Sequence, residues 1–209
     1  AKCIFKSDER ANRIEECYYD AEGNPCLSND GYAKYTKKYD NRGNMVEVRY
    51  FDTNNNPCLS KENIAGITRK YDEHNNCVEE CFFDTEGNPC MSNQGLAKYI
   101  KKYDERGNQI EIHFFDTEGN PCMCNMGYAI QTHIFDKKNL CIEVCYYGIH
   151  GEPINVRGYF KDTRVYDDRN NVKEFVYTDK DGNLLAEQVF TQQVTFTQGE
   201  ARIKGLPVG

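Results

Sequence analysis

The chain repeats itself every 32 residues, and this period constrains its fold more than any other feature. The segments Tyr39–Asn44, Tyr71–Asn76 and Tyr103–Asn108 share a Tyr-Asp start and lie 32 residues apart. The same frame contains Asp8 and Asp136, and a sixth copy carries Asp167 one residue early. A unit of this length buries its apolar side chains only against its neighbours. We therefore predict six copies over residues 1–185, the first of which begins in mid-repeat, within a larger protein.

Each copy holds two turns twelve residues apart, of the general form Asp-x-x-Gly-Asn, as at Asp40–Asn44 and Asp52–Asn56; the fifth copy departs from it with Gly148 at the second aspartate position. A three-residue hairpin loop ends in a left-handed residue, which Gly and Asn adopt most readily. That position holds Gly or Asn in eleven of twelve turns, which predicts hairpins. The residues are Ala11, Gly43, Asn75, Gly107, Asn139 and Asn170 in the first turns, and Gly23, Asn55, Gly87, Gly119, Gly151 and Gly182 in the second. Ala11 is the exception and predicts strain or a frayed first hairpin.

The segments between turns have the alternation of strands, and no helical periodicity stands out. In the fourth copy we expect strands over residues 96–104 and 108–116 and a short third piece near 120–124. The first turn then pairs Lys101 with Glu111, a favourable pair of about 0.2–1 kcal/mol. The same register pairs Lys37 with Glu47, Arg69 with Glu79, His133 with Glu143, Arg164 with Glu174 and Phe5 with Glu15. The fold class is therefore all-β: an elongated, twisted antiparallel sheet or solenoid-like array, with both faces partly covered.

Composition argues against a nucleic-acid partner and against a membrane-spanning helix. The net charge is −7, and nucleic-acid affinity comes mainly from Lys and Arg on phosphates. No run approaches the roughly 18 apolar residues that a membrane-spanning helix needs. Fifteen Tyr and eleven Phe without Trp make aromatic rings the main apolar material of the chain.

The Tyr-Asp-x-x-Gly-Asn segments at Tyr39–Asn44 and Tyr103–Asn108 resemble the bacterial tyrosine-aspartate (Rhs-like) repeats. The aromatic hairpins also resemble membrane-occupation (MORN-type) repeats. The resemblance covers residues 1–185 and implies a β-hairpin fold and a non-catalytic role in a bacterial protein. Two departures are plain: family repeats are usually shorter, and often have Arg where this chain has Asn44 and Asn108. A closed shell of the kind that long arrays of that family form would need far more than six copies.

Residues 186–209 leave the repeat frame. The stretch 189–196 is typical of one more strand, which we interpret as a cap. Ala201 followed by Gly205-Leu206 and Gly209 looks like the start of a PDZ-type peptide-binding domain. The alternative is a capping strand with a disordered end.

Eleven cysteines suggest thiol chemistry. Four of them share one repeat position, namely Cys26, Cys58, Cys90 and Cys122; another position holds Cys17, Cys81 and Cys145. Equivalent positions lie two strands, about 10 Å, apart, whereas a disulfide needs Cα atoms within about 7 Å. We therefore expect the cysteines to be reduced thiols that act as small apolar side chains. This favours a reducing environment, either the cytoplasm or the surface of an anaerobe. A disulfide between diagonal positions, such as Cys81 with Cys90, remains an alternative. Zinc would need two tight pairs, and only Cys122–Cys124 and Cys77–Cys81 come near.

Other chemistry has weaker support. The Asp-x-x-Gly-Asn turns supply too few oxygens for calcium, and Asp and Asn are ordinary turn residues. The glutamates opposite the cations recur in every copy, whereas an active site is normally unique. The four histidines share no repeat position, so a Cys–His nucleophile, for example one using His113, rests on little. We predict no catalytic residues, no metal site and no cofactor.

Tyrosines are the best candidates for binding, because the ring is large and amphipathic. If exposed along one face, they would form a ladder suited to a peptide or a sugar; otherwise they form the core. The candidates are Tyr35, Tyr39, Tyr71, Tyr99 and Tyr103. The predicted function is a protein-interaction scaffold or spacer that binds another protein or flanking domains of its own. The alternatives are a carbohydrate-binding array and a cysteine-based metal or redox module.

Overall fold

The computed structural model describes residues 2–197 and 200–207, with side chains described for residues 2–186. The described residues form fourteen strands and no helix, so none of their segments is a helix that could cross a membrane. The strands lie in chain order in one open sheet, and each paired neighbour is antiparallel. They are β1 (Lys2–Ser7), β2 (Arg13–Tyr19), β3 (Lys34–Tyr39), β4 (Met45–Phe51), β5 (Gly66–Tyr71), β6 (Cys77–Phe83), β7 (Lys98–Tyr103), β8 (Gln109–Phe115), β9 (Ile130–Phe135), β10 (Cys141–Tyr147), β11 (Lys161–Tyr166), β12 (Val172–Thr178), β13 (Leu184–Thr197) and β14 (Glu200–Pro207). The predicted all-β hairpin array is confirmed.

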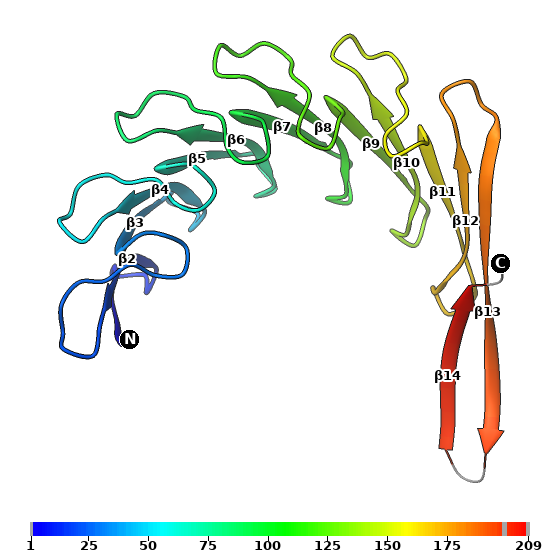
Figure 1. Ribbon diagram of the computed structural model, residues 1–209, viewed down its shortest axis with the longest axis horizontal. Coiled ribbons are helices and arrows are strands. Elements are labelled where there is room, and N and C mark those ends of the chain that lie inside the picture. The colour runs from blue at the N-terminus through cyan, green and yellow to red at the C-terminus, as the bar shows by residue number, and fades with distance from the viewer. Residues whose placement is uncertain (1, 198–199, 208–209) are drawn as a thin grey trace.

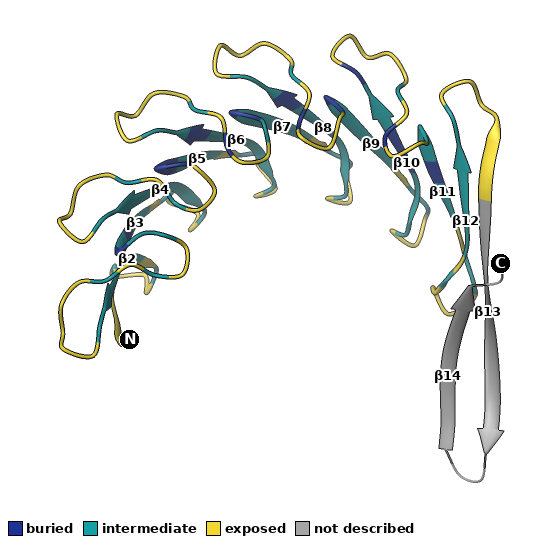
Figure 2. Cartoon of the chain, in the orientation of Figure 1, coloured by how far each residue is buried: buried dark blue, intermediate teal, exposed yellow. Residues whose placement is uncertain are grey.

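The hairpins follow one another along an arc (Figure 1). A first turn joins the two strands of each hairpin and lies toward the inner side of the arc, while the longer connections lie toward its outer side. Each connection holds the second turn and then a third loop, which in the fourth copy spans residues 121–129. Exposed residues gather in these turns and loops, and the buried ones lie in and next to the strands (Figure 2).

The turn chemistry agrees with the sequence in all twelve turns, because every predicted left-handed residue has a positive φ. Ala11 has φ 64°, and its N–H donates to the Asp8 carbonyl at 3.0 Å, which closes the first hairpin. The predicted fraying is therefore not found. The left-handed conformation of Ala11 costs about 1–2 kcal/mol relative to a right-handed one, so strain remains at this position.

The strand register differs by one residue from the predicted one, because a β-bulge follows each first turn. In the fourth copy Tyr103 pairs with Gln109, but Lys102 pairs with Glu111, so Ile110 is an extra residue. Each glutamate therefore lies opposite the residue that follows its predicted partner in the first strand of the hairpin. The observed ion pairs are Lys6–Glu15 at 2.5 Å, Lys38–Glu47 at 3.1 Å, Lys70–Glu79 at 2.7 Å and Lys102–Glu111 at 2.8 Å. The equivalent positions of copies five and six hold Ile134 and Val165.

One face of the sheet is covered by the third loops. Each loop begins at a proline that bridges to the end of the preceding strand, as Pro89 does with Phe83. Leu96, which is 1% exposed, then packs into a core with strand residues Phe82 and Phe114. The buried loop residues of that core are Ile64, Leu96, Cys124, Tyr128 and Val156. We call this side the covered face.

Backbone hydrogen bonds tie consecutive third loops together. Lys61 N–H donates to the Asp30 carbonyl at 2.8 Å, and Asn125 N–H donates to the Gln94 carbonyl at 2.8 Å. Asn125 adds a side-chain bond from Nδ2 to the Asn93 carbonyl at 2.7 Å. The third loops of copies one to four therefore form a continuous ladder, in which each loop is bonded to the next.

No other strand packs on the opposite face, since all contacts among the described strands are between neighbours in the sheet. Long cationic side chains lie over its aromatic rings instead. Lys34 Nζ lies 4.5 Å from the centre of the Phe51 ring, and Lys98 Nζ lies 4.7 Å from that of Phe115. Both faces are therefore partly covered, one by the third loops and the other by cationic side chains. We call this side the open face.

The tail continues the sheet. The predicted strand at residues 189–196 lies within β13, which pairs with both β12 and β14. Residues 201–207, where the sequence looks like the start of a PDZ-type domain, lie in β14, while residues 208–209 lie outside the described part. The assignment of a separate domain there stays a prediction.

Candidate functional site

Of the five candidate tyrosines, Tyr35 is buried and Tyr99 is partly buried against the core. Tyr35 is 8% exposed, and its hydroxyl donates to Glu16 Oε2 at 2.6 Å. Tyr99 packs edge-on against Phe82, with ring centres 6.2 Å apart. Burial, together with Glu80, raises the pKa of the Tyr99 hydroxyl. Both rings therefore belong to the covered face and offer little surface to a ligand.

The other three candidates tie one copy to the one before it. The hydroxyls of Tyr39, Tyr71 and Tyr103 donate to backbone carbonyls at the start of the second strand of the preceding hairpin. The bonds are Tyr39 to Arg13 at 3.0 Å, Tyr71 to Met45 at 2.9 Å and Tyr103 to Cys77 at 3.0 Å; Tyr166 donates likewise to Cys141 at 2.7 Å. The five candidates thus form no exposed ladder, and their contacts favour the alternative in which the rings hold the sheet together.

Three buried carboxylates on the covered face were missed by the sequence reasoning: Glu16, Glu80 and Asp162. Each has an arginine partner; Arg69 Nε bonds to Glu80, and Arg164 Nη2 lies 2.9 Å from Asp162 Oδ2. Burial alone would raise the pKa of Glu16, but hydrogen bonds from Cys3, Tyr35 and Arg13 outweigh it and lower the pKa to about 2.

A second period of 64 residues could have revealed the first two of these acids. Glu16 and Glu80 are 64 residues apart, as are Cys17, Cys81 and Cys145, because alternate copies resemble each other more closely than adjacent ones. The copies between them hold Val48 and Ile112 at the carboxylate position. The carboxylates are bound to neighbours within the fold and so serve its structure.

All eleven cysteines are free thiols. Burial raises the pKa of the Cys58, Cys90 and Cys122 thiols, which keeps them protonated and weakly nucleophilic. Among the described residues no three His, Cys, Asp or Glu side chains gather as a metal site requires. His113 bonds to Glu111 and stacks on Phe115 rather than pairing with a thiol.

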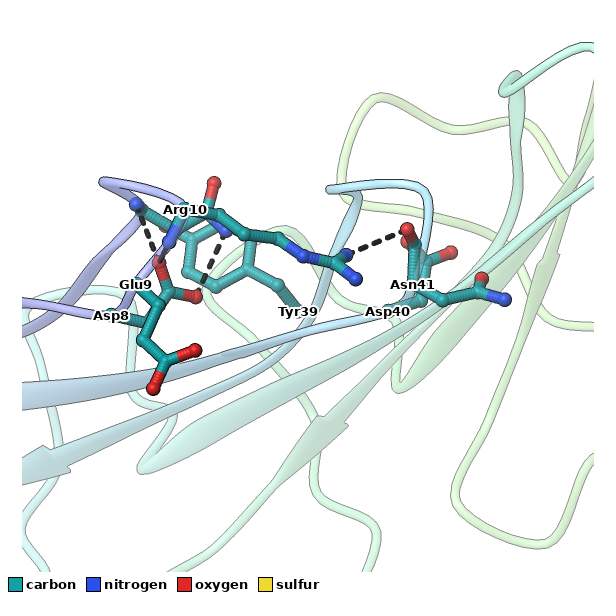
Figure 3. A pocket seen from close by; sticks show the side chains of 7 residues that line it. Asp8, Glu9, Arg10, Tyr39, Asp40 and Asn41 are labelled. Atoms are coloured by element: carbon teal, nitrogen blue, oxygen red, sulfur yellow. Dashed lines mark hydrogen bonds between the residues drawn. The ribbon is translucent and has the colours of Figure 1, made fainter.

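The first turns create a surface hollow of about 380 Å³ between copies one and two (Figure 3). Arg10 Nη1 crosses this hollow to donate to the Asn41 carbonyl at 2.7 Å. The Asp8 carboxylate accepts bonds from the Arg10 and Asn12 N–H groups, and the Asn12 side chain foremost lowers its pKa. Arg42 and Arg106 make the same crossing in later copies. The aspartate oxygens are thus engaged in turn capping, which leaves them poorly placed to serve as calcium ligands.

The fifth hairpin has a hollow of about 410 Å³ on the covered face. There Phe135 stands where other copies have the bonding tyrosine, and Val144 stands where the third copy has Glu80. His133 Nδ1 is buried there and has no hydrogen-bond partner among the described residues. Burial and the charge of Arg164 lower the pKa of His133, so this imidazole is neutral near pH 7.

One apolar position is exposed in four consecutive third loops. We call these residues the apolar row: Leu27 is 56% exposed, Leu59 45%, Met91 37% and Met123 44%. The neighbouring residue Met126 is 50% exposed. The sequence shows Leu or Met at this repeat position, but its exposure was not anticipated.

Comparisons with known proteins found solved structures of low similarity and no sequence match. No protein-family model and no curated protein sequence matches the chain. It is similar to solved structures titled TcdB2-TccC3-Cdc42 (13% identity, TM-score 0.45, 96% of this chain), TcdB2-TccC3-TEV (13%, 0.49, 91%) and the Photorhabdus luminescens Tc holotoxin pore (13%, 0.45, 96%). The chain spans about a tenth of the length of the chains that it matches, since it covers 10% of each.

Proposed function

We propose that this array is a non-catalytic protein-interaction module within a larger bacterial protein. The main observation behind this proposal is that carboxylates and their cationic partners recur from copy to copy and are already bonded to each other within the fold. The Lys–Glu pairs recur in four copies, and the buried carboxylates are paired with arginines. Such a surface offers rows of like groups, which suit an extended partner better than a single small substrate.

The partner is another protein or a flanking domain of the same protein. A chain with a net charge of −7 is poorly suited to nucleic acid. Reduced thiols with raised pKa values suit a reducing environment. Because the tyrosine contacts are internal, no observation favours the sugar-binding alternative, and the scattered thiols give no support to a metal or redox module. A passive spacer is the main rival.

Affinity capture from the source lysate tests this proposal. The bait is the whole 209-residue chain, and the control is an unrelated folded protein of equal net charge. We expect a protein that the array retains and that free array displaces in a saturable manner. Recovery of nothing beyond the control would reject the interaction module in favour of a spacer.

A further inference from the structure

The connections of copies one to four combine exposed apolar side chains with a concentrated net negative charge. The four segments 20–31, 52–63, 84–95 and 116–127 contain nine acidic residues and one lysine, a formal charge of −8. The whole chain carries −7, so all remaining residues together carry +1. The charge asymmetry therefore coincides with the apolar row.

The ladder of third loops holds the apolar row rigidly. Residues on either side of the row are anchored: Cys90 N–H donates to the Phe82 carbonyl at 3.1 Å, and Ser92, which is 7% exposed, bonds to Leu96. Met91 between them stays exposed. A preformed surface binds with a smaller loss of conformational entropy than a mobile one.

Exposed apolar side chains in regular order mark interaction surfaces. Methionine, which supplies Met91, Met123 and Met126, adapts its shape to a partner. The fifth connection ends the pattern, because Asn155 occupies the row position and the segment 148–159 carries one acid, Glu152, against Arg157. The surface is thus confined to copies one to four.

The spacing of the row favours a helix over a strand. Successive copies are two strands, about 10 Å, apart in the sheet, and the row residues recur at least that far apart because the connections lie on the outer side of the arc (Figure 1). Two turns of an α-helix advance about 10.8 Å, so a helix presents one apolar residue to each copy. An extended strand advances about 10 Å in three residues. Because its side chains alternate between two sides, every second contact residue would point away from the row. A nucleic acid or an anionic membrane would be repelled by the acidic flanks.

We propose that the apolar row and its acidic flanks form a docking surface for a basic amphipathic helix of a partner protein, with apolar residues about every seventh position. This inference rests on the proposed function and specifies its surface and partner. Acidic residues such as Glu62, Glu86 and Glu118 face the basic flanks of the helix, and the row residues meet its apolar side.

Titration calorimetry with a designed peptide tests the docking surface. The probe is a 28-residue helical peptide with Leu at every seventh position, Lys flanking each Leu, and Ala elsewhere. The control peptide has the same composition, but two of its Leu residues are moved to the opposite side of the helix. We expect the periodic peptide to bind the whole chain at least about tenfold more tightly, and more weakly as salt is added.

Variants of the chain then locate the site. Leu59→Ser/Met91→Ser should weaken binding about tenfold or more. Glu86→Gln/Glu118→Gln should weaken it several-fold, whereas the matched change Glu73→Gln/Glu105→Gln, at exposed first turns, should leave it unchanged. Melting temperatures of all variants should match that of the parent, because these side chains are exposed. Equal binding of both peptides, absence of binding, or binding that the row variants do not weaken would overturn the proposal.

The two proposals fail in distinguishable ways. A natural partner captured equally by the parent and by the Leu59→Ser/Met91→Ser bait would reject this surface and leave the interaction module standing. If no bait captures a partner, the interaction module itself fails.

Discussion

The third and fifth hairpins, β5–β6 and β9–β10, build the same backbone with different side chains. In the third, Arg69 bonds to Glu80, and the Tyr71 hydroxyl donates to Met45. At the positions 64 residues later the fifth has His133, Val144 and Phe135, and Gln109 of the fourth hairpin stands where Met45 stands in the second. Both hairpins keep the same register and the same bulge. The turns and the bulge therefore set the backbone, and the polar contacts of the covered face only add stability to it.

The largest expected effect comes from giving the third hairpin one residue of the fifth. Glu80→Val should lower the free energy of unfolding by about 3 kcal/mol, because it leaves the half-buried Arg69 without its carboxylate. Adding Arg69→His should recover most of that loss, since the pair then matches His133 and Val144. Urea denaturation of the single and double variants measures the coupling. Additive losses would contradict the comparison.

The two hairpins should also differ in their response to acid. The pKa of His133 is lowered in the folded chain, so the unfolded chain binds more protons as the pH falls below about 6.5. The stability of the fifth hairpin should therefore be full above that pH and fall below it, by at most about 1.4 kcal/mol per pH unit. Amide hydrogen exchange of β9–β10 and β5–β6 at pH 7.5 and 5.5 measures this.

The matched variants of this test are His133→Gln, which should flatten the pH response of β9–β10, and His74→Gln, at an exposed turn, which should not. An equal acid response in β5–β6 and β9–β10 of the parent would argue against His133 as its source.

A smaller effect is expected from the tyrosine hydroxyl. Tyr71→Phe should lower the free energy of unfolding by about 1 kcal/mol, because the bond to the Met45 carbonyl is lost. The reverse change, Phe135→Tyr, should raise it by up to about 1 kcal/mol by donating to the equivalent Gln109 carbonyl. Thermal and urea unfolding check both. A lower free energy of unfolding in both variants would mean that the tyrosine hydroxyl does not stabilise the contact between copies.

The smallest effect is expected on the open face. Lys102→Ile copies Ile134 of the fifth hairpin and removes an ion pair whose lysine side chain is 59% exposed. The change in free energy of unfolding should stay within about 0.5 kcal/mol, and the difference should shrink with added salt. A larger loss would show that the Lys–Glu rows contribute more than surface pairs usually do.

The sequence by itself determined the number of copies, the place of the first and second turn of each copy and the fold class. It did not reveal the turn within the third loops, such as the one that the Gly95 N–H closes on the Ser92 carbonyl. In the twelve predicted turns only Gly, Asn and, at a cost, Ala11 sit at the left-handed position, and that requirement is local to the turn. The register was wrong by one residue, because the cations come in adjacent pairs such as Lys101-Lys102. Either register then gives the glutamate a positive partner. The bulge residue Ile110 is of a type found throughout the strands, so it does not mark the bulge in the sequence.

Only the tertiary structure decided which face the third loops cover, and with it the role of each side chain. A tyrosine has the same identity whether it is exposed or buried. Tyr35 is buried, with the loop residue Tyr32 edge-on at 6.2 Å and the Lys37 ammonium 4.4 Å from its ring centre. Leu96 and Met91 stand five residues apart in one loop, yet the first is buried and the second is exposed. That difference depends on contacts between neighbouring copies. The repeat period shows that the copies are neighbours, but it does not show which side chains face the contact.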